Sequence, residues 1–182
     1  MSEQRILVLG ANGQLGKALR AEFPHAVFYG REECDFTQID QVHNLPIDQF
    51  DVVINAAAYT AVDAAETSEG AALAEAVNTK AVEILSAAST EHGVLLVHVS
   101  TDYVFDGNQK IPYIETDEFN PLGVYAKTKA QGDLAVMTVP RHYLLRTSWV
   151  IGEGNNFVRT MASLAERGIK PSVRSEEHTS EL

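Results

Sequence analysis

Residues 5–18 read RILVLGANGQLGKA, and this stretch decides the fold that the sequence predicts. A continuous apolar run ends at three glycines, Gly10, Gly13 and Gly16, and passes into a helix-forming segment. Glycine permits a tight turn and a close approach of the backbone to an anion, so this order is typical of a buried strand that turns beneath a phosphate. The helix that follows directs N–H groups at the same point. Taken alone, the pattern fits a nucleotide site and a plain strand-turn-helix junction equally well.

The composition suits one globular domain with a buried core. The 182 residues are 45% hydrophobic and 21% charged, with a formal net charge of −11. This acidic balance, without a run of lysine and arginine, argues against a nucleic-acid partner. The single cysteine, Cys34, excludes an intramolecular disulfide and is compatible with a reducing compartment. We expect Cys34 to be a small buried or half-buried residue.

The two ends of the chain carry no targeting signal that we can identify. There is no secretory signal and no run of about eighteen apolar residues, so we expect a cytoplasmic protein without a membrane partner. Residues 174–182 are polar and resemble a translated sequencing adapter, so we expect a non-native tail, with a natural acidic tail as the alternative. Residues 1–173 would then be a nucleotide-binding domain that is incomplete at its C-terminal end, followed in the whole protein by a substrate domain.

Strand and helix patterns alternate along the chain. After the first strand, further strands are predicted over residues 26–29, 50–55, 94–101 and 142–146. Helices are predicted over residues 14–22, 66–91, 123–137 and 156–166, with Thr37 capping a short helix that runs through Asn44. This alternation predicts an α/β fold with a doubly wound parallel sheet. The irregular connection over residues 102–121 is long enough to indicate a functional or mobile loop.

The residues after the second and third strands bear on the ligand. Many dinucleotide folds place an acidic residue after the second strand to bind ribose hydroxyls. This chain has Arg31, which suits a 2′-phosphate and favours NADP, although acidic residues follow it and it also fits a solvated loop. The small residues Ala56, Ala57 and Ala58 leave room for a flat ligand or pack against a helix. Asparagine is unfavourable inside a helix, so we expect the side chain of Asn78 either to make a buried hydrogen bond or to be exposed to solvent.

Tyr125 and Lys129 lie one helical turn apart and therefore on one face of a predicted helix. A nearby ammonium favours the phenolate and lowers the pKa of a tyrosine from about 10, which makes the phenol a usable proton donor to a carbonyl oxygen. Lys129 also suits a ribose hydroxyl and so the positioning of a nicotinamide ring. The pair is common on helix surfaces, where its role is structural. Beside the glycine turn and the strand that ends at Ser100 and Thr101, it indicates a reductase site.

Several blocks in fixed order resemble the extended short-chain dehydrogenase/reductase superfamily. They are the glycine turn, NAAA at residues 55–58, STDYVFDG at residues 100–107 and the Tyr125-x-x-x-Lys129 pair. Within that superfamily, GQLG at 13–16, AYTAVD at 58–63, STDYVFDG and RTSWV at 146–150 closely resemble the dTDP-4-dehydrorhamnose reductases. The resemblance runs from Arg5 to about Val173.

The resemblance implies a NAD(P)-binding Rossmann fold and the reduction of dTDP-4-dehydro-L-rhamnose to dTDP-L-rhamnose, a precursor of cell-surface polysaccharide. NADPH is the expected hydride donor, with NADH left open. The implied catalytic residues are Thr101, Tyr125 and Lys129; Thr101 would bind the substrate carbonyl oxygen, and Tyr125 would donate the proton as hydride reaches C4. Asp102 and Trp149 would join Thr101 in binding the substrate. The expected cofactor contacts are Gly10, Asn12, Gly13, Gln14, Leu15, Gly16, Arg31, Asp35, Phe36, Ala56, Ala57, Ala58, Tyr59, Thr60, Tyr125 and Lys129. Asn78 matches a helix asparagine that some short-chain reductases use in a proton relay.

Two departures from the family pattern qualify these expectations. Some members have a magnesium-linked dimer built on a glutamate just after the glycine turn, but this chain has Lys17 and Ala18 there, so we expect no metal site. The second departure is the substrate domain that we expect to be missing, without which the chain as given would be inactive. A homodimer of the complete protein stays open.

Two other functions remain open. One is a non-catalytic regulatory subunit, similar to the β subunit of methionine adenosyltransferase. The other is an epimerase or dehydratase that acts on another nucleotide sugar. The presence of Thr101, Tyr125 and Lys129 together favours an enzyme, and the STDYVFDG block favours a reductase.

Overall fold

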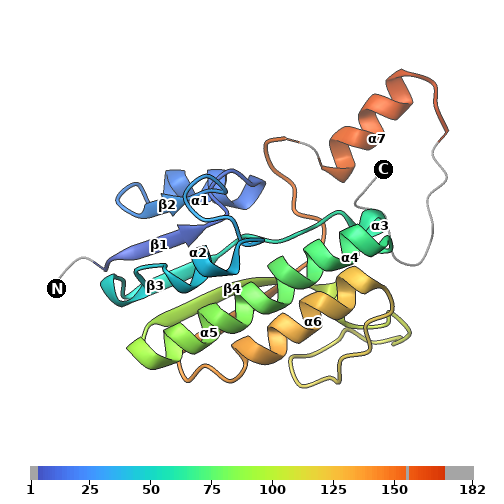
Figure 1. Cartoon of the computed structure of the whole chain (residues 1–182). Helices are drawn as coiled ribbons and strands as arrows, with labels where there is room; N and C mark the ends of the chain where they lie inside the picture. Colours follow the sequence, from blue (N-terminus) through green and yellow to red (C-terminus); the bar gives the residue numbers. More distant parts are fainter. Residues whose placement is uncertain (1–3, 155, 171–182) are drawn as a thin grey trace.

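A five-stranded parallel sheet forms the centre of the computed structural model, which describes residues 4–154 and 156–170 (Figure 1). Its strands are β1 (Ile6–Leu9), β2 (Val27–Tyr29), β3 (Val52–Asn55), β4 (Leu95–Thr101) and β5 (His142–Thr147). They lie in the order β2-β1-β3-β4-β5, and each neighbouring pair is parallel. The chain winds outward in both directions from β1 and β3, so a crevice opens at the carboxyl ends of these two strands. The predicted doubly wound parallel sheet is confirmed.

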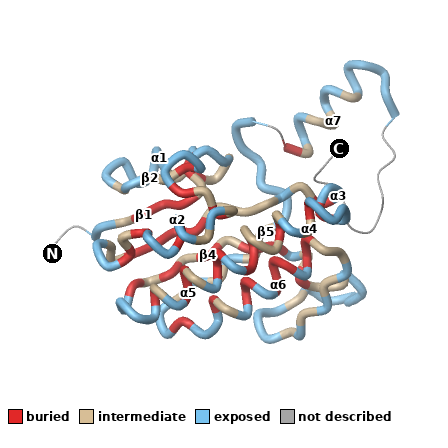
Figure 2. Tube along the Cα trace, viewed as in Figure 1, coloured by how far each residue is buried: buried red, intermediate tan, exposed pale blue. Residues whose placement is uncertain are grey.

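Helices cover both faces of this sheet. The helices before β5 are α1 (Gln14–Glu22), α2 (Ile39–His43), α3 (Val62–Ala65), α4 (Ser68–Ala74), α5 (Ala81–His92) and α6 (Val124–Val136). A further helix, α7 (Phe157–Glu166), lies apart from the sheet (Figure 1). On one face, Leu7 and Leu96 of the sheet belong to a buried cluster with side chains of α2, α5 and α6. On the other face, Val8 and Ile54 pack with Leu19 of α1. Figure 2 shows the buried residues concentrated on the strands and on α5 and α6, whereas α7 has no buried residue.

The long helix predicted over residues 66–91 exists, but it is not uniform. It begins after Thr67, whose Oγ1 accepts a hydrogen bond from Gly70 N at 3.1 Å, and it ends at Gly93, where φ is +66°. Between α4 and α5 the residues Glu75–Lys80 form a π-helical segment. A π-helical turn holds an extra residue and is often found at functional sites. Asn78 lies in this segment, 1% exposed and hydrogen-bonded, so the buried alternative is confirmed.

The predicted capping role of Thr37 is wrong. The N-cap of α2 is Gln38, and no side chain caps that end. Thr37 instead donates from Oγ1 to Asp35 Oδ1 at 2.7 Å, and the same oxygen accepts from Thr37 N at 2.9 Å. This local turn draws the Thr37 hydroxyl away from the helix, because aspartate side chains bind the backbone two residues ahead.

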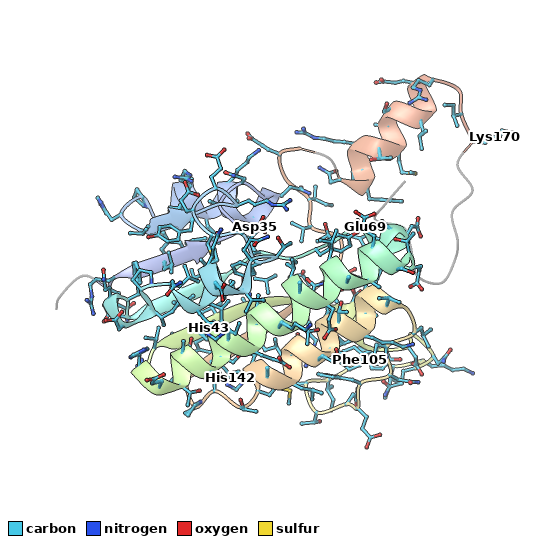
Figure 3. The ribbon with its side chains drawn as sticks, in the orientation of Figure 1. Asp35, His43, Glu69, Phe105, His142 and Lys170 are labelled. Carbon is cyan, nitrogen blue, oxygen red and sulfur yellow. The ribbon has the colours of Figure 1, made fainter. Side chains whose placement is uncertain are left out.

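The long connection after β4 is folded around the carboxylate of Asp106. This carboxylate accepts hydrogen bonds from Tyr113 Oη at 2.6 Å, Asn120 Nδ2 at 2.8 Å and Asn108 N at 3.0 Å. These bonds hold the pKa of Asp106 well below its ordinary value. The Phe105 ring, labelled in Figure 3, stacks on Tyr113 at 4.3 Å between centroids. The connection is therefore an ordered wall beside α6.

In the described part of the chain, no helix combines the length and the apolar composition needed to cross a membrane.

Outward-facing residues of β5 include Tyr143 and Leu145, which are 62% and 48% exposed.

A close backbone approach between α6 and the π-helical segment predicts a measurable stability effect. A Cβ on Gly132 of α6 would lie 2.2 Å from the carbonyl oxygen of Asn78. Gly132→Ala therefore has to separate α6 from the π-helical segment. Because the clash is with backbone, the cost is in the upper part of the overpacking range, about 2–3 kcal/mol, and the better helix propensity of alanine offsets roughly 1 kcal/mol of it. We expect a net loss of about 1–2 kcal/mol in the free energy of unfolding, measured by urea denaturation.

Gly93→Ala is the control for adding a Cβ to a glycine, because the added Cβ meets nothing within 4 Å. Only the positive φ of residue 93 opposes that substitution, at about 1 kcal/mol. The close packing at Gly132 would be contradicted by a Gly132→Ala protein that is as stable as the wild type.

Candidate active site

The glycine turn after β1 is a backbone cradle. Gly10 has φ of +86°, and a Cβ there would lie 2.6 Å from Ala57 N, so only glycine fits. A Cβ on Gly16 would lie 2.2 Å from Gly10 O, so α1 packs directly against the turn. The N-cap of α1 is Gly13, and no side chain caps this end, so the amide dipoles of α1 are directed at the space above the turn. The turn thus has the geometry that a pyrophosphate needs.

On one side the turn borders a pocket of about 300 Å³, which we call the β2 pocket. The predicted residues that line it are Gly10, Asn12, Gly13, Arg31, Asp35, Phe36, Ala56, Ala57, Ala58 and Tyr59. Cys34 also lines it and is buried, as expected. Burial, helped by the nearby Asp35, raises the pKa of the Cys34 thiol to about 11, so the group is a neutral thiol at pH 7.

The Arg31 guanidinium lies at the edge of this pocket. Its Nε donates to Asp35 Oδ2 at 3.0 Å, and the arginine side chain is 75% exposed. Burial alone would raise the pKa of Asp35, but hydrogen bonds from Thr37 and Arg31 hold that pKa below its ordinary value. Figure 3 shows Asp35 on the stretch that follows β2. Asp35 therefore anchors a cation beside the pocket.

On the other side the turn borders a pocket of about 390 Å³, which we call the β4 pocket. The predicted residues that line it are Gly13, Gln14, Leu15, Ala56, Ala58, Thr60, Thr101, Asp102, Tyr125, Lys129 and Trp149. Gly13, Ala56 and Ala58 line both pockets. The structure therefore brings together every predicted site residue except Gly16, which lies beneath the turn as a packing contact.

Two adjoining pockets on either side of an anion cradle suit a dinucleotide, because such a cofactor has a pyrophosphate between two nucleosides. The Cβ test at Gly10 supports this fit, since any side chain there would fill the cradle.

The three predicted catalytic residues come from two elements that meet at the β4 pocket. Thr101 ends β4, and Tyr125 and Lys129 lie one turn apart on α6; all three are buried. The Thr101 Oγ1 accepts from Tyr103 N at 3.2 Å and lies 3.3 Å from Asp102 Oδ1. The Tyr103 ring contacts the Tyr125 ring edge to face, with centroids 5.9 Å apart. The phenol is thus held by an aromatic neighbour beside a hydroxyl-ended strand.

Lys129 is 2% exposed, which is unusual for a lysine. Burial lowers the pKa of its ammonium to about 8, against the opposing attraction of Asp133. Its Nζ donates to the carbonyl oxygen of Val99 at 2.9 Å. A lysine with a pKa in this range suits proton transfer near neutral pH.

The Asn78 side chain links two of the segments that form this site. Its Oδ1 accepts from Tyr59 N at 2.9 Å, and its Nδ2 donates to Tyr59 O at 3.0 Å and to Thr128 Oγ1 at 3.3 Å. The side chain thereby links the segment after β3 to α6. Its role in a proton relay stays a proposal.

A group of buried and half-buried polar residues beneath the β4 pocket was not predicted from the sequence. It contains His98 of β4, Asp133 of α6 and Arg146 of β5. His98 carries the one available signal, because it is a polar residue within a nearly all-apolar strand. Asp133 follows Lys129 by one helical turn, a spacing that also fits an ordinary exposed ion pair. Among residues 4–154 and 156–170, no three side chains of His, Cys, Asp or Glu lie close enough together to hold a metal ion.

A third pocket, of about 180 Å³, adjoins the catalytic residues. It lies between the wall formed by the connection after β4 and the side chain of Tyr125, which it shares with the β4 pocket.

Comparisons with known proteins agree with this geometry. The family model described as the RmlD substrate binding domain matches residues 4–178. A dTDP-4-dehydrorhamnose reductase of Aggregatibacter actinomycetemcomitans is 45% identical over an alignment of 174 positions, which covers 89% of this chain and 57% of that relative. The chain thus spans a little over half the length of this curated relative.

Solved structures agree as well. A dTDP-4-dehydrorhamnose reductase of Clostridium acetobutylicum is 40% identical and superimposes with a TM-score of 0.83 over 90% of this chain and 60% of its own. The enzyme of that name from Bacillus anthracis, in complex with NADP, is 35% identical with a TM-score of 0.83, over 91% of this chain and 61% of its own. These findings confirm the resemblance that the motifs indicate, and the chain belongs to the family of the RmlD substrate binding domain.

Proposed function

We propose that this chain is the cofactor-binding and catalytic part of an enzyme that reduces the C4 ketone of dTDP-4-dehydro-L-rhamnose. The observation that supports the proposal best is that Thr101, Tyr125 and Lys129 line one pocket, which shares the glycine turn with a second pocket. The similar proteins named as dTDP-4-dehydrorhamnose reductases support the choice of substrate.

In the proposed reaction the chain supplies a proton and the cofactor, when bound, supplies a hydride to C4. The Thr101 hydroxyl and the Tyr125 phenol bind the ketone oxygen, and the phenol gives that oxygen its proton, so the product is an alcohol. In its ammonium form, Lys129 stabilises the phenolate that is left on Tyr125. Asp102 and Trp149, which line the same pocket, contact the sugar.

We propose NADPH as the hydride donor. Arg31 lines the β2 pocket at the position where many dinucleotide folds have an acidic residue, and a guanidinium binds a phosphate through two N–H groups. The Bacillus anthracis structure contains NADP. A nucleotide sugar and NADPH are small cytoplasmic metabolites, which favours a cytoplasmic protein.

The other two hypotheses make different predictions for the same assay. A regulatory subunit would bind cofactor without turnover, and an epimerase or dehydratase would convert other nucleotide sugars. No contact in the described residues favours either of them over a reductase.

The proton donor can be tested in a fusion of residues 1–173 with the C-terminal part of the Aggregatibacter actinomycetemcomitans relative. We expect Tyr125→Phe to lower kcat by about 100-fold or more, because general acid catalysis contributes roughly 10²–10⁴-fold. NADPH binding should change by no more than about twofold, since the phenylalanine ring keeps the packing against Tyr103. The measurements are NADPH oxidation at 340 nm with dTDP-4-dehydro-L-rhamnose and NADPH fluorescence titration.

Tyr143→Phe is the matched control, because that tyrosine is 62% exposed on β5 and should leave kcat unchanged. Full activity of Tyr125→Phe would overturn the assignment of the proton donor. A fusion that binds NADPH but does not consume it with this ketone would overturn the proposed substrate.

The cofactor preference can be tested on the chain as given. We expect Arg31→Ala to reduce the ratio of NADPH to NADH affinity by about tenfold, which is the loss of roughly one charge-assisted hydrogen bond. Dissociation constants for both cofactors are measured by fluorescence titration. Arg167→Ala, at the exposed end of α7, should leave the ratio unchanged. An equal ratio in Arg31→Ala and the wild type would refute a 2′-phosphate contact by this residue.

A further inference from the structure

Beneath the β4 pocket lies a chain of buried polar groups that ends at Lys129, and the proposed reaction does not use its other two members. It runs from Asn55 of β3 through His98 of β4 to Lys129 of α6, and all three side chains are at most 2% exposed. His98 Nδ1 lies 3.0 Å from Asn55 Nδ2, and His98 Nε2 lies 3.1 Å from Lys129 Nζ. At such burial, each hydrogen bond must match a donor with an acceptor.

The backbone settles the orientation of the Asn55 amide. Ala57 N donates to Asn55 Oδ1 at 3.1 Å, and a backbone N–H can only donate. The oxygen of the amide therefore faces Ala57, and the NH₂ group faces the imidazole. An NH₂ group is a donor, so His98 Nδ1 has to be an acceptor without a proton.

It follows that His98 is neutral and carries its proton on Nε2. A doubly protonated ring would place an N–H against the Asn55 NH₂ group. Burial also holds the pKa of His98 well below its ordinary value, which agrees with a neutral ring. The Nε2 hydrogen then faces Lys129 Nζ, because Asp133 Oδ1 is 3.9 Å from Nε2 and outside hydrogen-bond distance.

The two forms of Lys129 differ in how they meet this hydrogen. An ammonium has three hydrogens and no lone pair, so it would present a donor to a donor at 3.1 Å. A neutral amine has a lone pair that accepts from His98 Nε2, and it keeps one hydrogen for Val99 O at 2.9 Å. The amine has a further hydrogen for the β4 pocket. The contacts around Nζ therefore match the amine better than the ammonium.

We propose that His98 is a positioning residue that fixes Lys129 Nζ through a hydrogen bond donated from Nε2 and thereby favours the uncharged amine form of Lys129. The inference rests on the proposed function for its meaning, because Lys129 acts there on the phenol of Tyr125. A lysine that gains and loses its proton near neutral pH can exchange a proton with the site during turnover, whereas a permanently charged one cannot.

The other charged groups near Lys129 act in the opposite direction or at a distance. On α6 itself, Asp133 attracts the ammonium and raises its pKa, and Tyr125 lies one turn away. From β5, Arg146 Nε lies 3.5 Å from Asp133 Oδ2, so this cation offsets part of the attraction by Asp133. The π-helical segment, which packs on α6, contributes Thr79 and Asn78 to that contact, and neither titrates.

The first test is the position of the His98 proton in the chain as given. Nitrogen-15 NMR distinguishes protonated from unprotonated imidazole nitrogens, and loss of the signals in His98→Phe assigns them. We expect Nε2 to carry the proton and Nδ1 to be bare. A proton on Nδ1 would overturn the proposal.

The second test moves that proton. In Asn55→Asp the carboxylate can accept from Ala57 N and from His98 Nδ1–H, so the proton moves to Nδ1, and the bare Nε2 becomes an acceptor for the ammonium. We expect the titration midpoint of Lys129, followed by NMR at its Cε and Nζ, to rise from about 8 in the wild type. The rise should be at least about one pH unit.

The carboxylate also adds a negative charge, so the same change is made in a His98→Phe background, where only that charge acts. The rise should be clearly larger with His98 present. Equal rises in the two backgrounds would overturn the proposal. If Asn55→Asp fails to fold, the position of the His98 proton in the wild type still tests the proposal. None of these measurements uses turnover, so an inactive fusion protein would contradict the proposed function without affecting them.

Discussion

The hydrogen bonds of the Asn78 side chain fix the segment after β3 against α6, and these two segments form opposite parts of the site. The segment after β3 is irregular, and its backbone at Tyr59 is bound by the Asn78 amide from both its N–H and its C=O. The same amide binds Thr128 Oγ1 on α6, and Thr79 Oγ1 donates to Thr128 O at 3.0 Å. The wall that the two pockets share is therefore attached to the helix that carries Tyr125 and Lys129. This attachment depends on the absence of a side chain at Gly132, because any Cβ there would hold α6 away.

The buried charges of the site cost stability that the rest of the domain has to supply. A lysine that is 2% exposed lies beside His98 and Asp133, both at 0% exposure, and uncompensated buried charge is strongly unfavourable. Arg146 extends the group outward: its guanidinium lies near Asp133 and 4.8 Å from the centroid of the Phe119 ring. The connection after β4 is thus joined to the sheet through Arg146, which also lies beside Asp133. Such a cost of burying titratable groups is common at sites that are arranged for chemistry and not for stability.

Local pattern predicted the scaffold and the residues that touch the pockets. The strands of the sheet are apolar runs with glycine or polar ends, and α1 begins and ends where the sequence indicates. Thr101, Tyr125 and Lys129 could be brought together because strand ends and helix faces follow from period and order.

The features that were not predicted depend on competing local hydrogen bonds or on contacts between distant segments. The Thr37 hydroxyl was free to cap α2 by sequence, but the Asp35 carboxylate competes for it. Composition does not mark the π-helical segment, because residues 75–80 contain no glycine or proline and their weaker helix formers, Val77, Asn78 and Thr79, are common in ordinary α-helices. His98 and Arg146 come near the catalytic helix only through strand pairing: Arg146 lies opposite Ser100 in the register of β4 and β5. No spacing along the chain contains that information.

The π-helical segment also determines how this helix responds to a change in its length. A π-helical turn holds one residue more than an α-helical turn, so removing one codon from residues 75–80 would let the segment close into an ordinary α-helix. Ala81, Val82 and Leu85 would then keep their places in the core, because α5 would keep its face toward the sheet. The deletion would instead remove the bulge in which Asn78 meets Tyr59. A deletion elsewhere in α4 or α5 has no such outlet, because each residue of an α-helix turns the chain by about 100°.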